Sequence, residues 1–393
     1  MFVRYLWGAR RLWRTPRQSR ILIYDASHEE LLRSYLAEWA PEVLHVRGEQ
    51  INVPVLFSSI FRKGRKFEAY IDNFIEAVRP SLVVTMIDNN PDFLALSKRH
   101  PAVETLFVQN GVRAYVGDIF ETLDTTGQSY RRSLFVDHML VFGSTVGAEY
   151  ARFVDGRVVL MGSIKNNHVE RVTSPRVGVI AFISQWRNYG PVLGGQQYSH
   201  DQFFQPDEVI LPFLEGYARE HEKQIMIVPV NSRGSELRNA EEKYFAALLG
   251  CTPQFVERPE PFGSYHAIDS AEVVVGVDST LAYESAARGN KTAILSIRGT
   301  LLGLPSYNFG WPGQLAAEGP FWTNHPDTKV FRRILDGLFA ADDATWRAAL
   351  VAERFSDLMR FDPSNTILRT VIRERLNAPH CSVDAPSNTG SSA

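Results

Sequence analysis

Short apolar runs alternate with amphipathic stretches along most of the chain. The apolar runs have the length of strands and are largely uninterrupted, which is typical of strands buried on both faces of a parallel sheet. The stretches between them, such as "HEELLRSYLAEWA" (28–40), repeat apolar residues at helical spacing. This order predicts a succession of β-α units. In the first half, the predicted strands are "ILIYDA" (21–26), "SLVVTMI" (81–87), "TLFVQN" (105–110), "HMLVF" (138–142) and "VVLMGS" (158–163).

The same pattern restarts after a polar stretch, "KNNHVERVTSP" (165–175), which has no apolar periodicity and contains Pro175. We interpret this stretch as a domain boundary. The sequence therefore predicts two doubly wound α/β domains in tandem, residues 21–165 and residues 176–343. In the second half, the predicted strands are "RVGVIAFIS" (176–184), "QIMIVPV" (224–230), "QFVER" (254–258), "EVVVGV" (272–277) and "KTAILSI" (291–297).

The two ends of the chain differ from this pattern. Residues 1–20, "MFVRYLWGARRLWRTPRQSR", carry six arginines, and the first acidic residue is Asp25. Apolar residues from Phe2 to Trp13 recur near helical spacing, so residues 1–18 predict an amphipathic helix on an anionic membrane surface. A solvated arm, or a helix packed on its own protein, is the alternative. At the other end, helices are predicted over residues 344–378, and the small polar residues 379–393 are expected to be disordered.

Composition and charge exclude several classes of function. A chain of 393 residues is too long for one ordinary core, which agrees with two domains. Its net charge of −2 provides no overall field for holding nucleic acid. The two cysteines show no metal-ligand spacing, which suits a reducing cytoplasm. No apolar stretch reaches the roughly 18 residues of a membrane span. We therefore expect a cytoplasmic protein, peripheral at the inner face of the membrane if the basic arm binds there.

A polar segment follows the predicted strand in "VVVGVDSTLAYESAARGNKTAIL" (273–295). In doubly wound domains, ligands bind where the carboxyl ends of the strands meet a crevice. Ser279 and Thr280 stand where a helix begins, and its free N–H groups and dipole suit a phosphate. Glu284 lies on the same helix face as Thr280, where its carboxylate would accept hydrogen bonds from a ribose diol. The alternative is that Ser279 is an ordinary helix cap and Glu284 an exposed helix residue.

Polar side chains follow other predicted strands as well. An arginine at such a place can form two parallel hydrogen bonds to a phosphate or carboxylate of the ligand. The alternative interpretation is an ordinary surface arginine in a tight turn. The segment "VQNGVR" (108–113) has two interpretations. It is a local turn formed by the dipeptide Asn-Gly, or it contacts the substrate from the first domain. The further donor-site candidates are Ser184, Gln185, Arg187, Asn231, Ser232 and Arg233, and the candidates on the acceptor side or at the hinge are Asn110, Gly111, Arg113 and Lys165.

Two carboxylates at strand ends, Asp88 and Asp278, are the candidates for acid-base or nucleophilic chemistry. A carboxylate there would deprotonate a sugar hydroxyl or stabilise an oxocarbenium-like centre. Asp278 has a structural alternative, which is to orient the start of the helix that follows it. Neither half shows an Asp-x-Asp pair or a His/Cys cluster, so no metal site is predicted.

Four segments together resemble the bacterial surface carbohydrate biosynthesis proteins, a group classed with the glycosyltransferases. They are spread over residues 105–298. One of them, "DSTLAYESAARG" (278–289), more loosely resembles the donor-binding segment of GT-B glycosyltransferases, including Kdo transferases and lipid A disaccharide synthase. The four segments are "FVQNGVRAYVGDIFETL", "LVFG" followed by "VVLMGSIKNN", "FISQWR", and "VGVDSTLAYESAARGNKTAIL".

The resemblance implies a GT-B fold of two Rossmann-like domains, with the acceptor bound by the first domain and a nucleotide sugar by the second. It implies no cofactor beyond this co-substrate and no essential metal. Similarity to Kdo transferases favours a CMP-sugar. The chain has Asn231 and Ser232 where many CMP-sugar transferases carry a His-Pro pair, so UDP, GDP and CDP donors stay open.

The function implied by the resemblance is transfer of a sugar to a growing surface polysaccharide or lipopolysaccharide, the acceptor being a glycan or a lipid-linked glycan. Two alternatives remain at this stage. A nucleotide-sugar epimerase uses the same fold, and a non-catalytic scaffold of carbohydrate assembly would have kept the fold without the chemistry.

Overall fold

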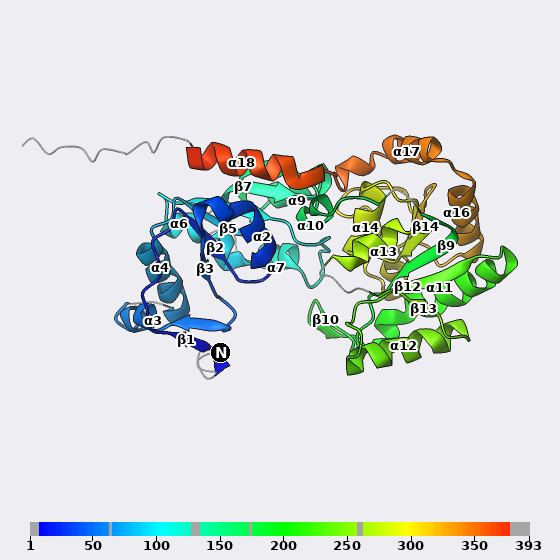
Figure 1. Ribbon diagram of the computed structural model, residues 1–393, viewed down its shortest axis with the longest axis horizontal. Helices are drawn as coiled ribbons and strands as arrows, with labels where there is room; N and C mark the ends of the chain where they lie inside the picture. The colour runs from blue at the N-terminus through cyan, green and yellow to red at the C-terminus, as the bar shows by residue number, and fades with distance from the viewer. Residues whose placement is uncertain (1–7, 63–64, 127–133, 173–174, 258–261, 378–393) are drawn as a thin grey trace, which may run out of the picture.

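The computed structural model describes residues 8–62, 65–126, 134–172, 175–257 and 262–377. Two lobes lie side by side along the long axis of the molecule, and each is built around a parallel sheet of six strands (Figure 1). The predicted class, α/β with two doubly wound sheets, is confirmed. The tail predicted to be disordered, residues 379–393, lies outside the described residues.

The sheet of the first lobe has the strand order β3-β2-β5-β6-β7-β8. Strands β2 and β5 are buried at every position, which explains their uninterrupted apolar sequences. The strands are β2 (Ile21–Tyr24), β3 (Glu42–Leu44), β5 (Leu82–Thr85), β6 (Glu104–Val108), β7 (Phe135–Val141) and β8 (Asp155–Leu160). The helices are α2 (Glu29–Leu36), α3 (Val53–Ile60), α4 (Lys66–Val78), α5 (Pro91–Leu94), α6 (Leu96–Arg99), α7 (Ile119–Thr125), α9 (Ser144–Ala151) and α10 (Ile164–His168).

The sheet of the second lobe has the order β13-β12-β9-β14-β15-β16. Its strands are β9 (Arg176–Ile183), β12 (Gln224–Val228), β13 (Gln254–Phe255), β14 (Ala271–Gly276), β15 (Thr292–Leu295) and β16 (Trp322–Thr323), and a small hairpin of β10 (Val192–Leu193) and β11 (Gln196–Gln197) follows β9. The helices are α11 (His200–Glu220), α12 (Glu236–Leu249), α13 (Gly263–Asp269), α14 (Thr280–Ala287), α15 (Arg298–Leu302), α16 (Thr328–Ala340) and α17 (Asp343–Ala352).

From Ala9 to Arg20 the N-terminal arm is not helical. Strand β1 (Arg10–Leu12) pairs in parallel with β4 (Gln50–Asn52), and the backbone N–H of Arg10 donates to the carbonyl of Glu49 at 3.0 Å. The predicted helix is therefore wrong for this part of the arm, because pairing with a distant segment overrides the local apolar spacing. Residues 1–7, which hold the rest of the predicted helix, lie outside the described residues.

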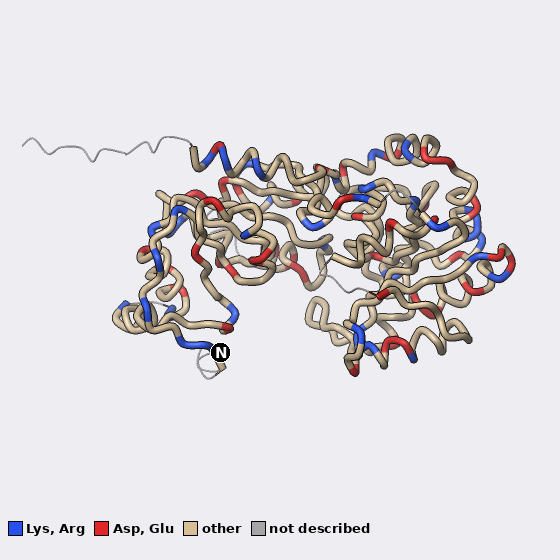
Figure 2. Tube along the Cα trace, viewed as in Figure 1, with Lys and Arg blue, Asp and Glu red and all other residues tan. Residues whose placement is uncertain are grey.

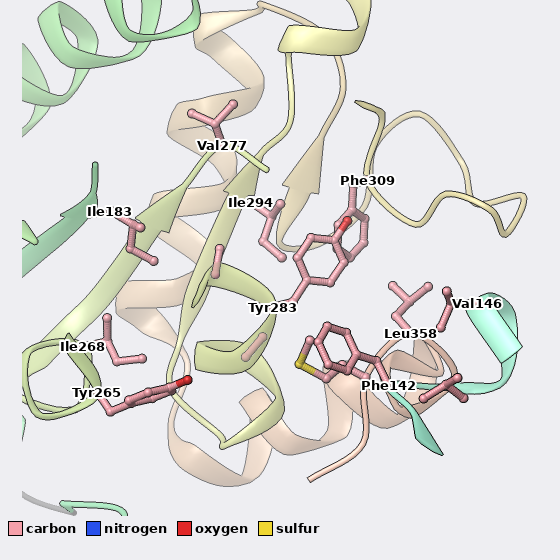
Figure 3. Close-up of a cluster of buried hydrophobic side chains, with 14 of the residues drawn as sticks. Phe142, Val146, Ile183, Tyr265, Ile268, Val277, Tyr283, Ile294, Phe309 and Leu358 are labelled. Atoms are coloured by element: carbon pink, nitrogen blue, oxygen red, sulfur yellow. The ribbon is translucent and has the colours of Figure 1, made fainter. Parts of the chain in front are cut away.

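The end of the chain joins the two lobes. In Figure 3, Leu358, from the segment between α17 and α18 (Thr366–Asn377), lies beside Val146 and Phe142 of the first lobe. The backbone N–H of Arg360 donates to the carbonyl of Phe142 at 2.9 Å. A side chain at Gly162 would come within 2.1 Å of the Arg360 carbonyl, so only glycine allows this approach. Helix α18 then packs into the core of the first lobe, which ties the lobes together.

Candidate functional site

A pocket of about 220 Å³ opens between the two lobes. From the first lobe it is lined by residues 112–114 and 116–118 of the loop after β6. From the second it is lined by residues that follow β9, β14 and β15, among them Gln185, Asp278 and Arg298. The pocket thus lies where the carboxyl ends of two parallel sheets meet, the place where doubly wound folds bind ligands. The remaining lining residues are Arg187, Pro191, Leu193, Phe203, Tyr283, Ser306, Tyr307, Asn308 and Trp311.

Arg298 is the one arginine of this pocket that was not among the sequence-based candidates. Its side chain is 1% exposed, pairs with Asp278 and lies 4.3 Å over the ring of Phe203. Its Nε donates to the carbonyl of Phe203 at 3.1 Å, but its buried Nη2 has no hydrogen-bond partner among the described residues. The signal was present, since Arg298 directly follows the predicted strand 291–297, as other candidates follow theirs.

Asp278 lies in the pocket as predicted from its place after β14. Its side chain is 11% exposed, and its Oδ1 accepts the hydrogen bond from Arg298. Its Oδ2 is buried and has no partner among the described residues. The pocket therefore contains both an unused N–H donor and an unused carboxylate oxygen, and buried groups of this kind are normally satisfied. Gln185, with Oε1 3.5 Å from Nη1 of Arg298, and the exposed Arg187 stand beside the pair.

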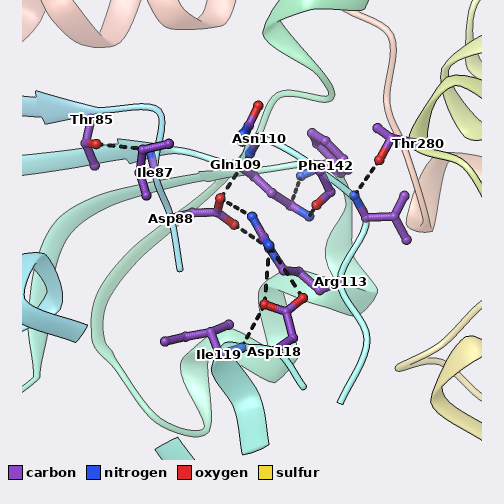
Figure 4. Close-up of polar contacts among 12 residues, drawn as sticks. Thr85, Ile87, Asp88, Gln109, Asn110, Arg113, Asp118, Ile119, Phe142 and Thr280 are labelled. Atoms are coloured by element: carbon purple, nitrogen blue, oxygen red, sulfur yellow. Dashed lines mark hydrogen bonds and ion pairs between the residues drawn. The ribbon is translucent and has the colours of Figure 1, made fainter. Parts of the chain in front are cut away.

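The start of α14 faces the first lobe. The hydroxyl of Ser279 caps the helix by accepting from the N–H of Leu281 at 3.3 Å. The hydroxyl of Thr280 accepts from the backbone N–H of Val112 at 2.9 Å, across the gap between the lobes (Figure 4). Gly111 lies beside this contact, since a side chain there would be 3.4 Å from the Thr280 hydroxyl. Ser279 and Thr280 do not line the pocket, so in this arrangement the helix start holds the lobes together.

Glu284 is neither an exposed helix residue nor open to a ribose. It is 4% exposed, and its carboxylate accepts hydrogen bonds from the hydroxyl of Ser163 in the first lobe and from that of Tyr265 at 3.0 Å. Burial is the main cause that raises the pKa of Glu284 above its usual value. The structure corrects the expected ribose contact, because both carboxylate oxygens are already bonded within the protein. Neither partner was identified from the sequence, since both lie on other elements.

Asp88, the other candidate for chemistry, is fully buried behind the pocket wall and does not line the pocket. Its carboxylate accepts from the guanidinium of Arg113 and from the backbone N–H of Asn110 at 3.1 Å (Figure 4). It also accepts from the hydroxyl of Tyr150 at 2.6 Å. Arg113 also bonds to Asp118, with an Nη1 to Oδ1 distance of 3.3 Å, and both of these residues line the pocket. Asp88 therefore shapes the pocket wall through Arg113.

Lys165 and Asn110 come together at the carboxyl edge of the first sheet. The ammonium of Lys165 donates to Oδ1 of Asn110 at 3.0 Å, and Nε2 of His28 lies 3.4 Å from it. Burial lowers the pKa of Lys165. The pKa of His28 is lowered first by burial and then by the charge of Lys165. The predicted hinge position of Lys165 thus has a partner from the loop after β6, although neither residue lines the pocket.

The remaining donor-site candidates lie away from the pocket. The carboxylate of buried Glu241 accepts from the hydroxyl of Ser184 at 2.6 Å and from the backbone and side-chain nitrogens of Asn231 at 3.1 and 3.0 Å. Ser232 is exposed, and Arg233 is 78% exposed and paired with Glu257 at 2.7 Å. The structure therefore gives Ser184 and Asn231 a role in joining two strand ends, through a glutamate that no local sequence pattern distinguishes.

The described residues contain no group of three or more His, Cys, Asp or Glu side chains placed to hold a metal ion. Among the same residues, no helix combines the length and the apolar character needed to cross a bilayer.

Two parallel sheets whose carboxyl edges face one pocket define a protein of GT-B architecture, and solved structures with this arrangement match nearly the whole chain. A glycosyltransferase from Rickettsia africae has a TM-score of 0.51 and 11% identity, covering 92% of this chain and 100% of its own. A "putative UDP-N-acetylglucosamine 2-epimerase" from Listeria monocytogenes has a TM-score of 0.54 and 10% identity, covering 91% and 97%. The UDP-GlcNAc 2-epimerase from Neisseria meningitidis bound to UDP-GlcNAc has a TM-score of 0.50 and 11% identity, covering 91% of both chains.

These identities establish the fold alone, and the chain has the GT-B fold. The family is established separately: the model described as "putative O-antigen biosynthesis protein" matches residues 106–376, well over half of the chain, and the chain belongs to that family. None of the curated protein sequences matches it significantly. The predicted resemblance to surface carbohydrate biosynthesis proteins of GT-B fold is confirmed.

Proposed function

We propose that this protein is a glycosyltransferase that binds a nucleotide sugar in the pocket between its lobes and transfers the sugar to a glycan of the bacterial surface. The observation that carries the proposal is the pair of Arg298 and Asp278, two residues of the pocket lining that each keep one buried polar atom without a hydrogen-bond partner among the described residues. Membership of an O-antigen biosynthesis family supports the glycan as acceptor, and the GT-B fold supports the nucleotide sugar.

The chemistry of the pair suits a donor phosphate beside a hydroxyl. The free N–H group of Arg298 would donate to a phosphate oxygen, and charge-assisted bonds of this kind are strong in a site shielded from water. Arg187 adds an exposed positive charge at the same pocket. The free oxygen of Asp278 would accept a proton or a hydrogen bond from a sugar hydroxyl, which is the acid-base role expected from the sequence. A volume of about 220 Å³ is below the roughly 300–1,000 Å³ usual for ligand pockets, so it suits one part of the donor.

The identity of the nucleotide stays a prediction. The sequence resemblance to Kdo transferases favours CMP, whereas the similar epimerase from Neisseria meningitidis was solved with UDP-GlcNAc bound. A second candidate function follows from the same comparison, because two of the three similar structures are described as 2-epimerases. An epimerase would use the same pocket and need no acceptor.

Calorimetry with CMP, CDP, UDP and GDP tests the donor site. The parent should bind one of these nucleotides, and Arg187→Gln should bind it more weakly. Arg233→Gln is the matched control, because that arginine is exposed and lies outside the pocket. A nucleotide at about 100 times its dissociation constant should stabilise the fold by about 2.7 kcal/mol, which a thermal shift detects. Absence of binding by all four nucleotides would refute the proposal.

Incubation with a panel of nucleotide sugars separates the reaction types. A transferase consumes the donor only when a glycan or lipid-linked glycan acceptor is supplied. Conversion of the donor to its epimer without any acceptor would replace the proposal with the epimerase function. A cell-envelope extract supplies candidate acceptors in the third arm of the experiment. If the protein binds the nucleotide but shows no turnover with this extract, it is a non-catalytic scaffold.

A further inference from the structure

Helix α3 exposes three large apolar side chains on one face. Phe57 is 58%, Ile60 55% and Phe61 87% exposed, the last standing directly after the helix. Residues three and four apart share one side of a helix, so these three lie together. The opposite side is packed, with Val55 and Ser59 buried. The helix, "VPVLFSSI", has no charged residue. An apolar face of this kind is unusual on a soluble surface and marks a site of interaction.

Basic residues and a tryptophan lie beside the start of α3. Strand β1 pairs with β4, the segment that leads directly into α3, and the side-chain nitrogen of Asn52 donates to the carbonyl of Arg14 at 2.8 Å. Trp13 is 71% exposed. Because Asn52 caps the start of α3, this contact places the backbone beside Trp13 at one end of a helix about 12 Å long. Arg10, Arg11 and Arg14 are also exposed, and no described residue forms an ion pair with any of them. Figure 2 shows the basic segment at the end of the first lobe, beside α3.

We propose that these residues form one docking surface for an anionic lipid bilayer, called here the β1-α3 surface: Arg10, Arg11, Trp13, Arg14, Phe57, Ile60 and Phe61. The geometry suits the boundary of a bilayer, where aromatic and aliphatic side chains enter the acyl region and arginines meet lipid phosphates. The charge complementarity is local, since the chain as a whole has a net charge of −2.

The β1-α3 surface is separate from the pocket between the lobes, and none of its residues lines that pocket. The proposal therefore does not depend on the proposed function. It differs from the sequence-based hypothesis of a helical membrane arm, because Arg10–Leu12 of that arm form a strand paired with β4. The apolar contribution comes largely from residues 57–61, which the hypothesis did not include.

Flotation with liposomes tests the surface. The full-length protein should float with vesicles that contain phosphatidylglycerol and not with vesicles of phosphatidylcholine alone. Phe57→Ser with Phe61→Ser should reduce binding at least about tenfold, since burying one such side chain corresponds to about tenfold or more in partitioning. Replacing Arg10, Arg11 and Arg14 by glutamine should also reduce binding at least about tenfold, because each basic residue near an anionic surface contributes about fivefold in affinity. The same replacement should weaken the dependence of binding on salt concentration.

Two controls separate the surface from general effects. Val177→Ser removes a side chain that is 87% exposed elsewhere, and Arg219→Gln removes an arginine that is 77% exposed on another helix. Both variants should float like the parent, and all variants should keep the melting temperature of the parent within about 2 °C, because the altered side chains are exposed. Equal flotation of the parent and the β1-α3 variants would overturn the proposal. Failure of the parent protein to float with anionic vesicles would also overturn it. If the parent self-associates and the phenylalanine variants abolish this, the surface is an interface between copies of the chain, and the proposal is overturned as well.

Discussion

Replacing Glu284 by alanine should lower the stability of the protein without weakening nucleotide binding. The carboxylate accepts two hydrogen bonds, from Ser163 and Tyr265, and the first of these joins the two lobes. Each hydrogen bond to a charged group is worth about 1.5–3 kcal/mol, and alanine leaves two buried hydroxyls without their acceptor. Removing a buried charge recovers part of this loss. We therefore expect a decrease in the free energy of unfolding of about 2–4 kcal/mol.

Urea unfolding of the parent, Glu284→Ala and Glu284→Gln measures this loss, and calorimetry with the bound nucleotide measures affinity. The glutamine variant keeps one acceptor oxygen and should lose less stability than the alanine variant. If Glu284→Ala unfolds like the parent but binds nucleotide ten- to a hundredfold more weakly, as loss of a ribose contact worth about 1.5–3 kcal/mol would require, the structural reasoning is refuted.

The glutamine variant also tests the effect of pH. Burial raises the pKa of Glu284 above its usual 4.5, so the folded state holds this proton more tightly than the unfolded state. The stability that this adds is fully present below about pH 4.5 and is lost as the pH rises through the higher folded pKa. Glutamine does not titrate, so the stability of Glu284→Gln relative to the parent should increase as the pH rises through this window. A difference that is independent of pH there would contradict the raised pKa.

Three further predictions follow from the pocket and its wall. Arg298→Lys should weaken nucleotide binding about tenfold or more, because lysine keeps the charge that pairs with Asp278 but loses the free N–H group, worth about 1.5–3 kcal/mol; calorimetry showing unaltered affinity would contradict this. Asp88→Asn should lower the free energy of unfolding by about 2–3 kcal/mol, because buried Arg113 loses one of its two charged partners and keeps only Asp118. Lost turnover at unchanged stability in urea would instead support a catalytic role for Asp88. Turnover should persist in EDTA, and activity that disappears on chelation and returns with magnesium or manganese would show a metal requirement.

Several features of the site were predictable because they depend on local rules. Parallel strands buried on both faces require continuous apolar runs, so the strands and the edge where they end could be located from the pattern alone. Asp278, Gln185, Arg187 and Arg113 follow such strands, and all four line the pocket. Arg298 obeys the same rule after β15, and applying the rule to every predicted strand would have included it.

Other assignments failed because the rule locates a residue along the chain but not the direction of its side chain. Asn231, Ser232 and Arg233 also follow a strand, yet β12 lies near the edge of the sheet, and these residues face Glu241 or solvent. Glu284 has the helical spacing from Thr280 that was expected. The lobes pack against both residues, however, so neither is open to a ligand.

The sequence by itself determined the two sheets, the order of their strands along the chain and the edge that carries polar residues, because apolar burial, helix caps and strand ends act over a few neighbouring residues. The tertiary structure alone decided which of those polar residues share a pocket and which are used to join the lobes. Glu284 meets Ser163 across 121 positions of the chain, and Thr280 meets Val112 across 168. Such contacts depend on how two packed lobes dock, and a hydrogen bond between groups so far apart leaves no periodicity or spacing in the sequence from which it could be inferred.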